Sequence, residues 1–144
     1  MKSMSIYLNF QDSAEAAFAF YGKIFGTEPT GIFRYGDMPS DSGMPAVSDE
    51  QKNLVMNISM PIPGGVTLMA SDMGPGMTFD LTIGNNIQIG LHADSREEAD
   101  RLYAALSSGG TTQMPLADQF WGDYYGELVD QFGITWLVFF TPES

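Results

Sequence analysis

The stretch "DSAEAAFAFY" (residues 12–21) returns later in the chain as "DSREEADRLY" (residues 94–103). The copies share the pattern D-S-x-E-x-A-x-x-Φ-Y, where Φ is Phe or Leu, at an offset of 94 − 12 = 82 residues. A second pair, "GVTLM" from Gly65 and "GITWL" from Gly133, has an offset of 133 − 65 = 68 residues. Two matched pairs in the same order indicate that one structural module occurs twice.

The two offsets differ by 82 − 68 = 14 residues, so the first copy carries about fourteen extra residues between its two matched stretches. The segment 35–53, "YGDMPSDSGMPAVSDEQKN", is rich in Pro, Gly, Ser and Asp, as loops are. We expect the extra residues of the first copy to form a loop there.

The first module is predicted to begin with a strand and a helix. "SIYLNF" alternates in polarity, which is typical of a strand. Asp12 and Glu15 then have the spacing of a capping box at a helix start, and Gly26 ends the helix. Three further strand segments are expected at 31–34, 54–60 and 66–71.

The second module repeats this plan. "NIQIGLHA" is the expected strand, Ser95 and Glu98 form an S-x-x-E capping box, and Gly109 and Gly110 end the helix. Its three further strands are expected at 113–116, 124–129 and 134–140.

These patterns predict an α+β fold of two tandem βαβββ modules. We expect one domain over residues 1–144, with module one at about 1–76 and module two at about 77–144. One helix per module covers only one face of its sheet, so the other face must meet the sister module or another chain. Two curved mixed sheets that enclose a cleft are the expected result.

Composition excludes several classes of protein. The net charge of 6 − 18 = −12 repels phosphate backbones and anionic lipids, so we expect neither a nucleic acid nor a membrane partner. The chain has no Cys and therefore no disulfide, thiolate nucleophile or Cys-based metal site. No apolar run approaches the roughly 18 residues of a membrane helix, and the first residues lack a signal-type apolar run. A cytoplasmic location is the expectation.

Strand alternation sorts side chains between the helix face and the cleft face. In the second module Ile87, Ile89, Leu91 and Ala93 are expected against the helix, which leaves Gln88, Gly90 and His92 for the cleft. In the first module Leu8 and Phe10 are expected against the helix, and Ser5, Tyr7 and Asn9 in the cleft. The hairpin strands are apolar on both faces, and the repeat pairs Met69 with Leu137.

The motif "FY-x-x-x-FG" (residues 20–26) in a paired βαβββ pattern resembles the vicinal oxygen chelate superfamily, which includes glyoxalase I, extradiol dioxygenases and bleomycin-resistance proteins. More narrowly, "YLNF" (7–10), "GDMP" (36–39), "LMASD" (68–72), "MPL" (114–116) and "FWGDYYGELVDQFGITW" (120–136) resemble the PhnB-like branch. That branch is often labelled with a demethylubiquinone methyltransferase name. The resemblance covers essentially the whole chain.

The resemblance implies where a metal would bind. The metalloenzymes of the superfamily hold the ion at four equivalent positions, which fall here on Ser5, Met69, Gln88 and Leu137. A catalytic divalent metal needs about three N, O or S ligands from the protein, and of these four residues only Gln88 offers even a weak one. We therefore expect no metal and no cofactor.

A few single polar side chains are the remaining candidates for chemistry. His92 is the single histidine, and its ordinary pKa would suit acid–base catalysis, although a structural role is the simpler interpretation. Asn57 stands where PhnB-like relatives carry His. Asp130 is interpreted as the residue that initiates the "DQFG" turn. Asp72 ends its strand and, with Gly74, Pro75 and Gly76, marks the crossover between the modules.

Aromatic residues gather in the closing motif. We expect Phe120 and Trp136 to pack in the core, and Trp121 and Tyr125 to stack on a ligand at the cleft mouth. "PIPGG" (61–65) and "MGPGM" (73–77) have neither the Gly spacing nor the following helix of a phosphate-binding loop, which argues against a nucleotide-type methyl donor site.

Three functional hypotheses remain. The first is a metal-free small-molecule binding protein that sequesters or senses an aromatic or cationic compound, in a cleft lined by Tyr7, Asn9, Met69, Gln88, His92, Trp121 and Tyr125. The second is an enzyme of the superfamily (lyase, isomerase or dioxygenase type) that uses His92 as a base or a metal at other ligands. The third is an interaction module whose open sheet pairs with another subunit, and a homodimer is expected.

Overall fold

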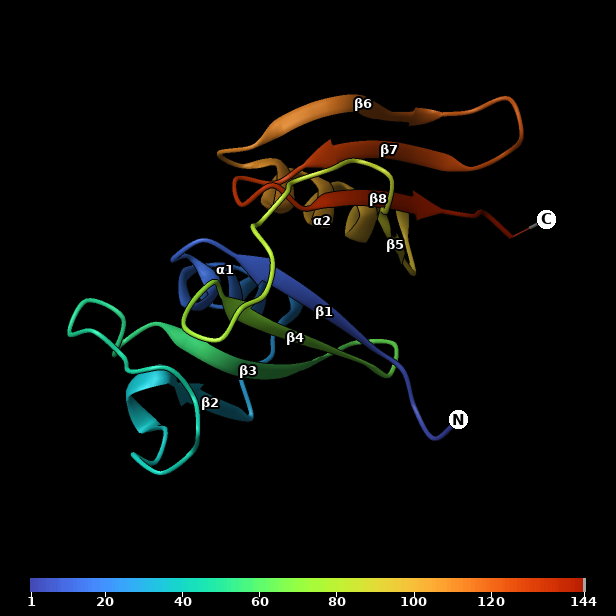
Figure 1. The fold of residues 1–144 in the computed structure, drawn as a ribbon. Coiled ribbons are helices and arrows are strands. Elements are labelled where there is room, and N and C mark those ends of the chain that lie inside the picture. Colours follow the sequence, from blue (N-terminus) through green and yellow to red (C-terminus); the bar gives the residue numbers. More distant parts are fainter. Residues whose placement is uncertain (144) are drawn as a thin grey trace. The chain divides into compact units, whose positions relative to one another are not determined.

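The computed structural model describes residues 1–143, which form two compact units. Unit 1 comprises Met1–Thr82, and unit 2 begins at Ile83. Each unit contains one α-helix and one four-stranded sheet (Figure 1). Neither sheet closes into a barrel, because each begins and ends in an edge strand.

Unit 1 has the order β-α-β-β-β. Its elements are β1 (Ser5–Phe10), α1 (Ala14–Phe25), β2 (Gly31–Arg34), the short 3-10 helix η1 (Tyr35–Asp37), β3 (Val55–Ile62) and β4 (Val66–Asp72). The strand order across the sheet is β1-β4-β3-β2. The β1–β4 pair is parallel, and the other two pairs are antiparallel. The extra residues of this module lie between η1 and β3, where the sequence predicts them.

Unit 2 repeats this topology. Its elements are β5 (Ile89–His92), α2 (Arg96–Ser107), β6 (Thr111–Asp118), β7 (Tyr124–Val129) and β8 (Thr135–Phe140). The sheet order is β5-β8-β7-β6, with β5 and β8 parallel and the other pairs antiparallel. The predicted α+β fold of two βαβββ modules is thus confirmed.

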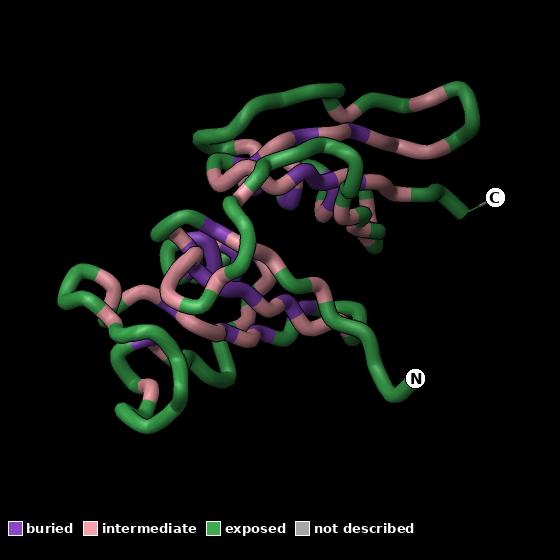
Figure 2. Tube along the Cα trace, in the orientation of Figure 1, coloured by how far each residue is buried: buried purple, intermediate pink, exposed green. Residues whose placement is uncertain are grey.

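Each helix covers one face of its own sheet. In unit 1, α1 packs on β3 and β4, and the fully buried Phe18 and Tyr21 belong to that layer. In unit 2, α2 packs on β6, β7 and β8, with Leu106 and Trp136 fully buried. Burying one such side chain contributes about 1.5–3 kcal/mol, so these layers are the cores of the units. Figure 2 shows the buried positions concentrated in the helices and the central strands.

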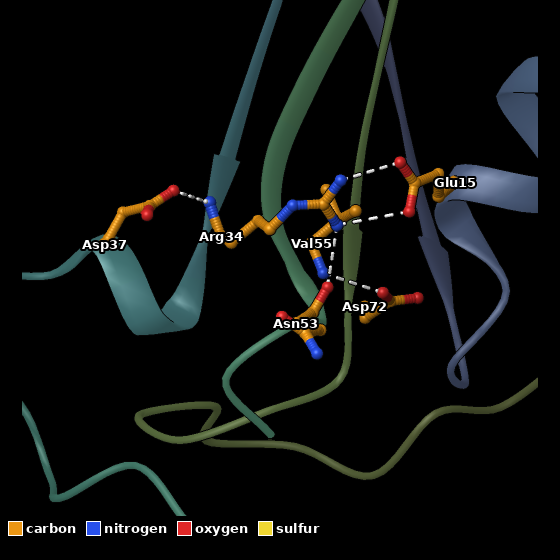
Figure 3. A network of polar contacts seen from close by, with 6 residues as sticks. All are labelled: Glu15, Arg34, Asp37, Asn53, Val55 and Asp72. Atoms are coloured by element: carbon orange, nitrogen blue, oxygen red, sulfur yellow. Dashed lines mark hydrogen bonds and ion pairs between the residues drawn. The ribbon is translucent and has the colours of Figure 1, made fainter. Parts of the chain in front are cut away.

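The start of α1 differs from the prediction. Asp12 has a φ of 62° and lies outside the helix, and Ser13 is the N-cap residue, without a side-chain hydrogen bond to the helix. The carboxylate of Asp72, at the end of β4, instead accepts a hydrogen bond from the backbone at the helix start. Its Oδ1 accepts a hydrogen bond from the Ala14 backbone N at 2.9 Å. Its Oδ2 accepts one from the Val55 backbone N at 2.8 Å, which Figure 3 shows. Asp72 ends β4, as the sequence predicts, and is only 2% exposed, so its two hydrogen bonds make it a buried junction of α1, β3 and β4.

The start of α2 confirms the prediction. Ser95 is the N-cap, and its Oγ accepts a hydrogen bond from the Glu98 backbone N at 3.0 Å. The Glu98 carboxylate reaches back and accepts a hydrogen bond from the Asp94 N at 2.7 Å. The two helix starts of the duplicated module are therefore stabilised in different ways.

Arg34 fixes the end of β2. Its guanidinium donates to both carboxylate oxygens of Glu15 on α1, at 3.1 and 2.7 Å, and to the Asn53 carbonyl at 2.8 Å (Figure 3). The Arg34 backbone N donates to Asp37 Oδ2 at 2.9 Å. These bonds hold both ends of the long loop between η1 and β3.

Two predictions about the core are wrong. Ile87 precedes β5 and is 79% exposed, because the strand begins two residues later and its alternation does not extend to that position. Phe120 is 98% exposed, because it lies in the turn between β6 and β7 rather than in a strand that packs on α2. Trp136 is fully buried, as predicted.

Candidate functional site

Four aromatic side chains form a continuous surface on the sheet of unit 2. The strand register places His92 opposite Phe139 and Phe139 opposite Tyr125, so the three rings form one cross-strand row. Because Trp136 and Val138 of the same strand β8 are buried, alternation places Phe139 on the face turned away from α2. We call His92, Trp121, Tyr125 and Phe139 the aromatic face.

The rings of the aromatic face contact each other in sequence. The ring centroids of His92 and Phe139 lie 3.9 Å apart, and those of Phe139 and Tyr125 lie 5.7 Å apart. Tyr125 contacts Trp121 at 5.7 Å with the rings inclined by 69°, and Trp121 contacts Phe120 at 5.1 Å. Edge-on and tilted pairs at these distances are favourable beyond their buried area, so the rings support each other's orientation.

Trp121 is held in place although it lies in a turn. Its indole Nε1 donates a hydrogen bond to Asp123 Oδ2 at 3.0 Å, while Thr141 Oγ1 donates to the other oxygen of Asp123 at 2.7 Å. Gly122 between them has a φ of 106°, a conformation that only glycine adopts easily. The indole is 49% exposed, so a large ring surface is both fixed and accessible.

A second carboxylate, besides Asp123, lies beside the aromatic face. Glu127 is two residues after Tyr125 on β7, and its Oε1 accepts a hydrogen bond from Gln88 Nε2 at 3.1 Å. Burial, and then the Glu127 charge, raise the pKa of the Tyr125 hydroxyl, so this phenol is neutral near pH 7. The site thus offers ring surface, one amide and the carboxylates of Glu127 and Asp123.

The corresponding face of the unit 1 sheet is polar. Tyr7 and Asn9 on β1 lie opposite Met69 and Ser71 on β4, and Asn57 is the neighbouring residue on β3. The Tyr7 hydroxyl is hydrogen-bonded to Ser71 Oγ, and Asn57 Nδ2 donates to the Tyr7 hydroxyl oxygen at 3.3 Å. We call Tyr7, Asn57 and Ser71 the polar network.

The two faces occupy equivalent positions of the duplicated module. Strand pairing relates Asn9 to His92 (92 − 9 = 83), Ser71 to Phe139 (139 − 71 = 68) and Asn57 to Tyr125 (125 − 57 = 68). The same cross-strand row is therefore built from hydrogen-bonding side chains in unit 1 and from rings in unit 2.

The structure divides the predicted ligand-binding residues between the units. Unit 1 brings together Tyr7, Asn9 and Met69, which share one sheet face. Unit 2 brings together His92, Trp121 and Tyr125, with Gln88 connected through Glu127. That both sets line one cleft stays a prediction, as does the single domain over residues 1–144.

Sequence reasoning missed Phe139, Ser71 and Glu127. Phe139 joins His92 to Tyr125, and period-two alternation from Leu137 would have assigned it to the same face. Ser71 and Glu127 could have been found by extending the same alternation along β4 and β7. The residues that they contact are far away in the sequence, so the spacing of residues along the chain does not reveal these contacts.

The residues at the superfamily's metal positions do not fit a divalent ion. Ser5, Met69, Gln88 and Leu137 provide no imidazole or carboxylate, and Leu137 has no ligating atom in its side chain. Within residues 1–143, no group of three or more His, Asp or Glu side chains has a geometry that could hold a metal ion.

Comparison with known proteins shows the family. A family model described as 3-demethylubiquinone-9 3-methyltransferase matches residues 2–139. The crystal structure of protein PA1353 from Pseudomonas aeruginosa is 33% identical, with a TM-score of 0.80 over 98% of this chain and 100% of that chain. A Bacillus cereus PhnB protein, itself titled a putative 3-demethylubiquinone-9 3-methyltransferase, is 23% identical with a TM-score of 0.76, covering 97% of this chain and 100% of that one.

The wider fold is shown by a glyoxylase/bleomycin resistance protein/dioxygenase domain from Frankia sp. EAN1pec. It is 13% identical, with a TM-score of 0.67 over 100% of this chain and 94% of that chain. The paired βαβββ topology, the family match along residues 2–139 and these likenesses agree. The chain belongs to the PhnB-like family, which carries the description 3-demethylubiquinone-9 3-methyltransferase and has the fold of the glyoxalase/bleomycin resistance/dioxygenase proteins.

Proposed function

We propose that this protein binds a small planar aromatic compound on the aromatic face of unit 2, without a metal ion, and thereby sequesters or senses it. The observation that carries the proposal is the continuous contact of four rings, of which the Trp121 indole is half-exposed and fixed by Asp123. A fixed and accessible ring surface suits stacking, because little side-chain entropy is lost when a ligand binds.

The charges near the aromatic face favour a neutral or cationic compound. Two carboxylates lie at this site: Asp123 bonds to the Trp121 indole, and Glu127 bonds to the neighbouring Gln88. The net charge of −12 acts in the same direction. A cation over Trp or Tyr gains a further 0.5–2 kcal/mol, as an order of magnitude.

The methyltransferase name of the family is not the activity that we propose. A nucleotide-type methyl donor is expected at a Gly-rich turn that opens a helix. The segment 61–65 instead comprises the last two residues of β3 and the turn into β4, and 73–77 leads toward β5 without an intervening helix. The binding proposal needs no such turn.

An enzyme with His92 as its base is the second candidate. His92 ends β5, is exposed, and packs edge-on against Phe139. Within residues 1–143, no carboxylate is hydrogen-bonded to its imidazole, whereas a catalytic base needs a group that orients it. Ring packing therefore favours a stacking role. If His92→Gln keeps ligand affinity but abolishes turnover of a bound compound, the enzyme hypothesis replaces ours.

Thermal-shift screening against neutral and cationic aromatic compounds tests the proposal. A compound at about 100 times its Kd should stabilise the protein by about 2.7 kcal/mol. Trp121→Ala should remove most of this effect, whereas the matched control Phe79→Ala, an exposed ring in unit 1, should leave it unchanged. Equal shifts in both variants would place the ligand elsewhere, and stoichiometric divalent metal in the purified protein would contradict metal-free binding.

A homodimer, a small-molecule partner and a cytoplasmic location remain part of the proposal. No helix in the described chain has the length and hydropathy of a membrane span, since α1 and α2 have 12 residues each. Sedimentation at several concentrations tests the dimer. A strict monomer at high concentration would contradict it, and would also remove the third hypothesis of a sheet that pairs with a second copy.

A further inference from the structure

The open face of the unit 1 sheet is built for hydrogen bonding. The polar strand residues of this face are Ser5, Asn9, Asn57, Ser59, Thr67 and Ser71. The opposite face presents buried apolar residues such as Ile58, Leu68 and Ala70 to α1. Tyr7 is the most prominent ring of this open face, with 48% of its surface exposed. Since the equivalent row of unit 2 is aromatic, the two modules present different chemistry to a ligand.

The directions of the hydrogen bonds in the polar network are fixed by counting protons. Ser71 Oγ donates to the Met56 carbonyl oxygen at 2.7 Å, because that carbonyl can only accept. A hydroxyl has one proton, so Ser71 must accept in its bond with Tyr7, and the Tyr7 hydroxyl must donate. Asn57 Nδ2, at 3.3 Å, is then the donor to Tyr7.

The exposed end of the network is therefore an acceptor. The only proton of the Tyr7 hydroxyl is directed to Ser71, which is 2% exposed, and one lone pair on the Tyr7 oxygen remains for a ligand. A ligand hydroxyl or N–H can use this lone pair, whereas an ether or a tertiary amine at the same place would meet an oxygen that has no proton to give.

We propose that the open face of unit 1 is a second binding face, selective for a ligand group that donates a hydrogen bond to Tyr7 Oη, such as a phenolic hydroxyl or an aromatic N–H. This inference extends the proposed function, in that it concerns the same class of ligand. It rests on the unit 1 network alone and does not require that a ligand touch the aromatic face.

The same bond directions exclude Ser71 as a nucleophile in this arrangement. Its proton goes to a backbone carbonyl, which cannot act as a general base, and its oxygen accepts from Tyr7. Selective binding is thus the chemistry that the polar network supports.

NMR titration with phenol and anisole tests the inference, because the two probes share a ring and differ in whether the oxygen carries a proton. The side-chain amide of Asn57 and the backbone amide of Tyr7 report binding at this face. One neutral hydrogen bond corresponds to a roughly fivefold lower Kd for phenol than for anisole. In Tyr7→Phe the two Kd values should become equal within about twofold.

Ser71→Ala is the second variant. It removes the acceptor of the Tyr7 proton, so Tyr7 becomes able to donate to the anisole oxygen, and the preference for phenol should fall while Tyr7 remains present. Thermal unfolding checks that the variant is folded. A phenol preference that persists in Tyr7→Phe, or its absence in the wild-type protein, would overturn the inference.

Trp121→Ala separates this claim from the proposed function. If the aromatic face binds rings, its resonances shift in the wild-type protein and not in Trp121→Ala, while the phenol preference at Asn57 is retained. If the unit 2 resonances never shift but the preference at Asn57 is present, the proposed function fails and the inference stands.

Discussion

Asp123 controls the orientation of the Trp121 indole. It accepts hydrogen bonds from Trp121 Nε1 and from Thr141 Oγ1, one on each carboxylate oxygen. We predict that Asp123→Ala weakens binding of an aromatic compound about fivefold, because ordering a freed side chain on binding costs about 1 kcal/mol. Free energy of unfolding should change little, since the bonds are at the surface.

The indole N–H resonances measure this effect directly, since the chain has two tryptophans. Asp123→Ala should move the Trp121 signal and leave that of Trp136, which donates to Asp130 Oδ2 at 2.8 Å, in place. Unchanged affinity together with a moved Trp121 signal would show that a fixed indole is not needed for binding.

The Asp130 carboxylate accepts several hydrogen bonds within unit 2. It is 3% exposed, and it accepts hydrogen bonds from the backbone N of Phe132 and Ile134 and from the Trp136 indole. We predict that Asp130→Ala lowers the free energy of unfolding by about 3–4 kcal/mol, because one buried indole N–H and two part-buried backbone N–H groups lose their acceptor. Urea denaturation measures it.

Asp130→Asn is the control for this substitution, since it retains one acceptor oxygen of the same size and should cost less than Asp130→Ala. A loss below about 1 kcal/mol in Asp130→Ala would contradict the assigned role. The prediction that Asp130 initiates the "DQFG" turn is confirmed by these bonds and by Gly133, which has a φ of 90°. Its bond to the Trp136 indole was not foreseen.

The two helices offer a matched test of N-capping. Ser95 caps α2 with its hydroxyl, whereas Ser13 at the start of α1 makes no such bond because Asp72 takes that place. We predict that Ser95→Ala costs about 1 kcal/mol of unfolding free energy and Ser13→Ala less than about 0.5 kcal/mol. Denaturant unfolding of both variants measures these changes. Equal losses of unfolding free energy would contradict the difference between the helix starts.

The Glu15–Arg34 ion pair joins α1 to β2 and should make stability depend on pH. The hydrogen bond from Arg34 lowers the pKa of the Glu15 carboxylate below its usual 4.5. A lowered folded-state pKa stabilises the fold above the unfolded value, and the gain is lost as the pH falls through the folded-state pKa. Because the Glu15 side chain is 55% exposed, the contribution is below about 1 kcal/mol.

The comparison of wild type with Glu15→Gln measures this contribution. We expect a small stability difference at pH 7 that shrinks as the pH falls below 4.5 and is lost once the pH is below the lowered folded-state pKa of Glu15. A difference that stays constant throughout an acid titration would show that packing, rather than charge, is responsible.

Strands and helices were predicted to within a few residues because their signals are local. The expected strand at 124–129 is β7 itself, and α2 begins at the predicted capping box. The α1 start was mispredicted because its acceptor, Asp72, is 58 residues away from Ala14 in the sequence. Phe120 was mispredicted because it lies in the turn between β6 and β7, where no helix or strand directs its ring into the core.

The duplication explains how far the site could be predicted. Alternation assigned Tyr7, Asn9 and His92 to the open faces correctly in register, since each lies on a regular strand. It could not show that Phe139 bridges His92 and Tyr125, or that the Tyr7 proton points to Ser71, because these contacts depend on which strands become neighbours. The strand register of both sheets must be known before equivalent positions can be compared. Only then is it clear that unit 2 carries rings where unit 1 carries polar groups.

An NMR titration of chelator-treated protein with an aromatic compound found by screening tests the central claim most directly. The chemical shift of the Trp121 indole N–H is the readout. The account predicts saturable shifts of Trp121, Tyr125 and His92 with one binding site on unit 2 and no requirement for added metal. Binding that appears only when a divalent ion is restored, or shifts that avoid these three residues, would contradict it.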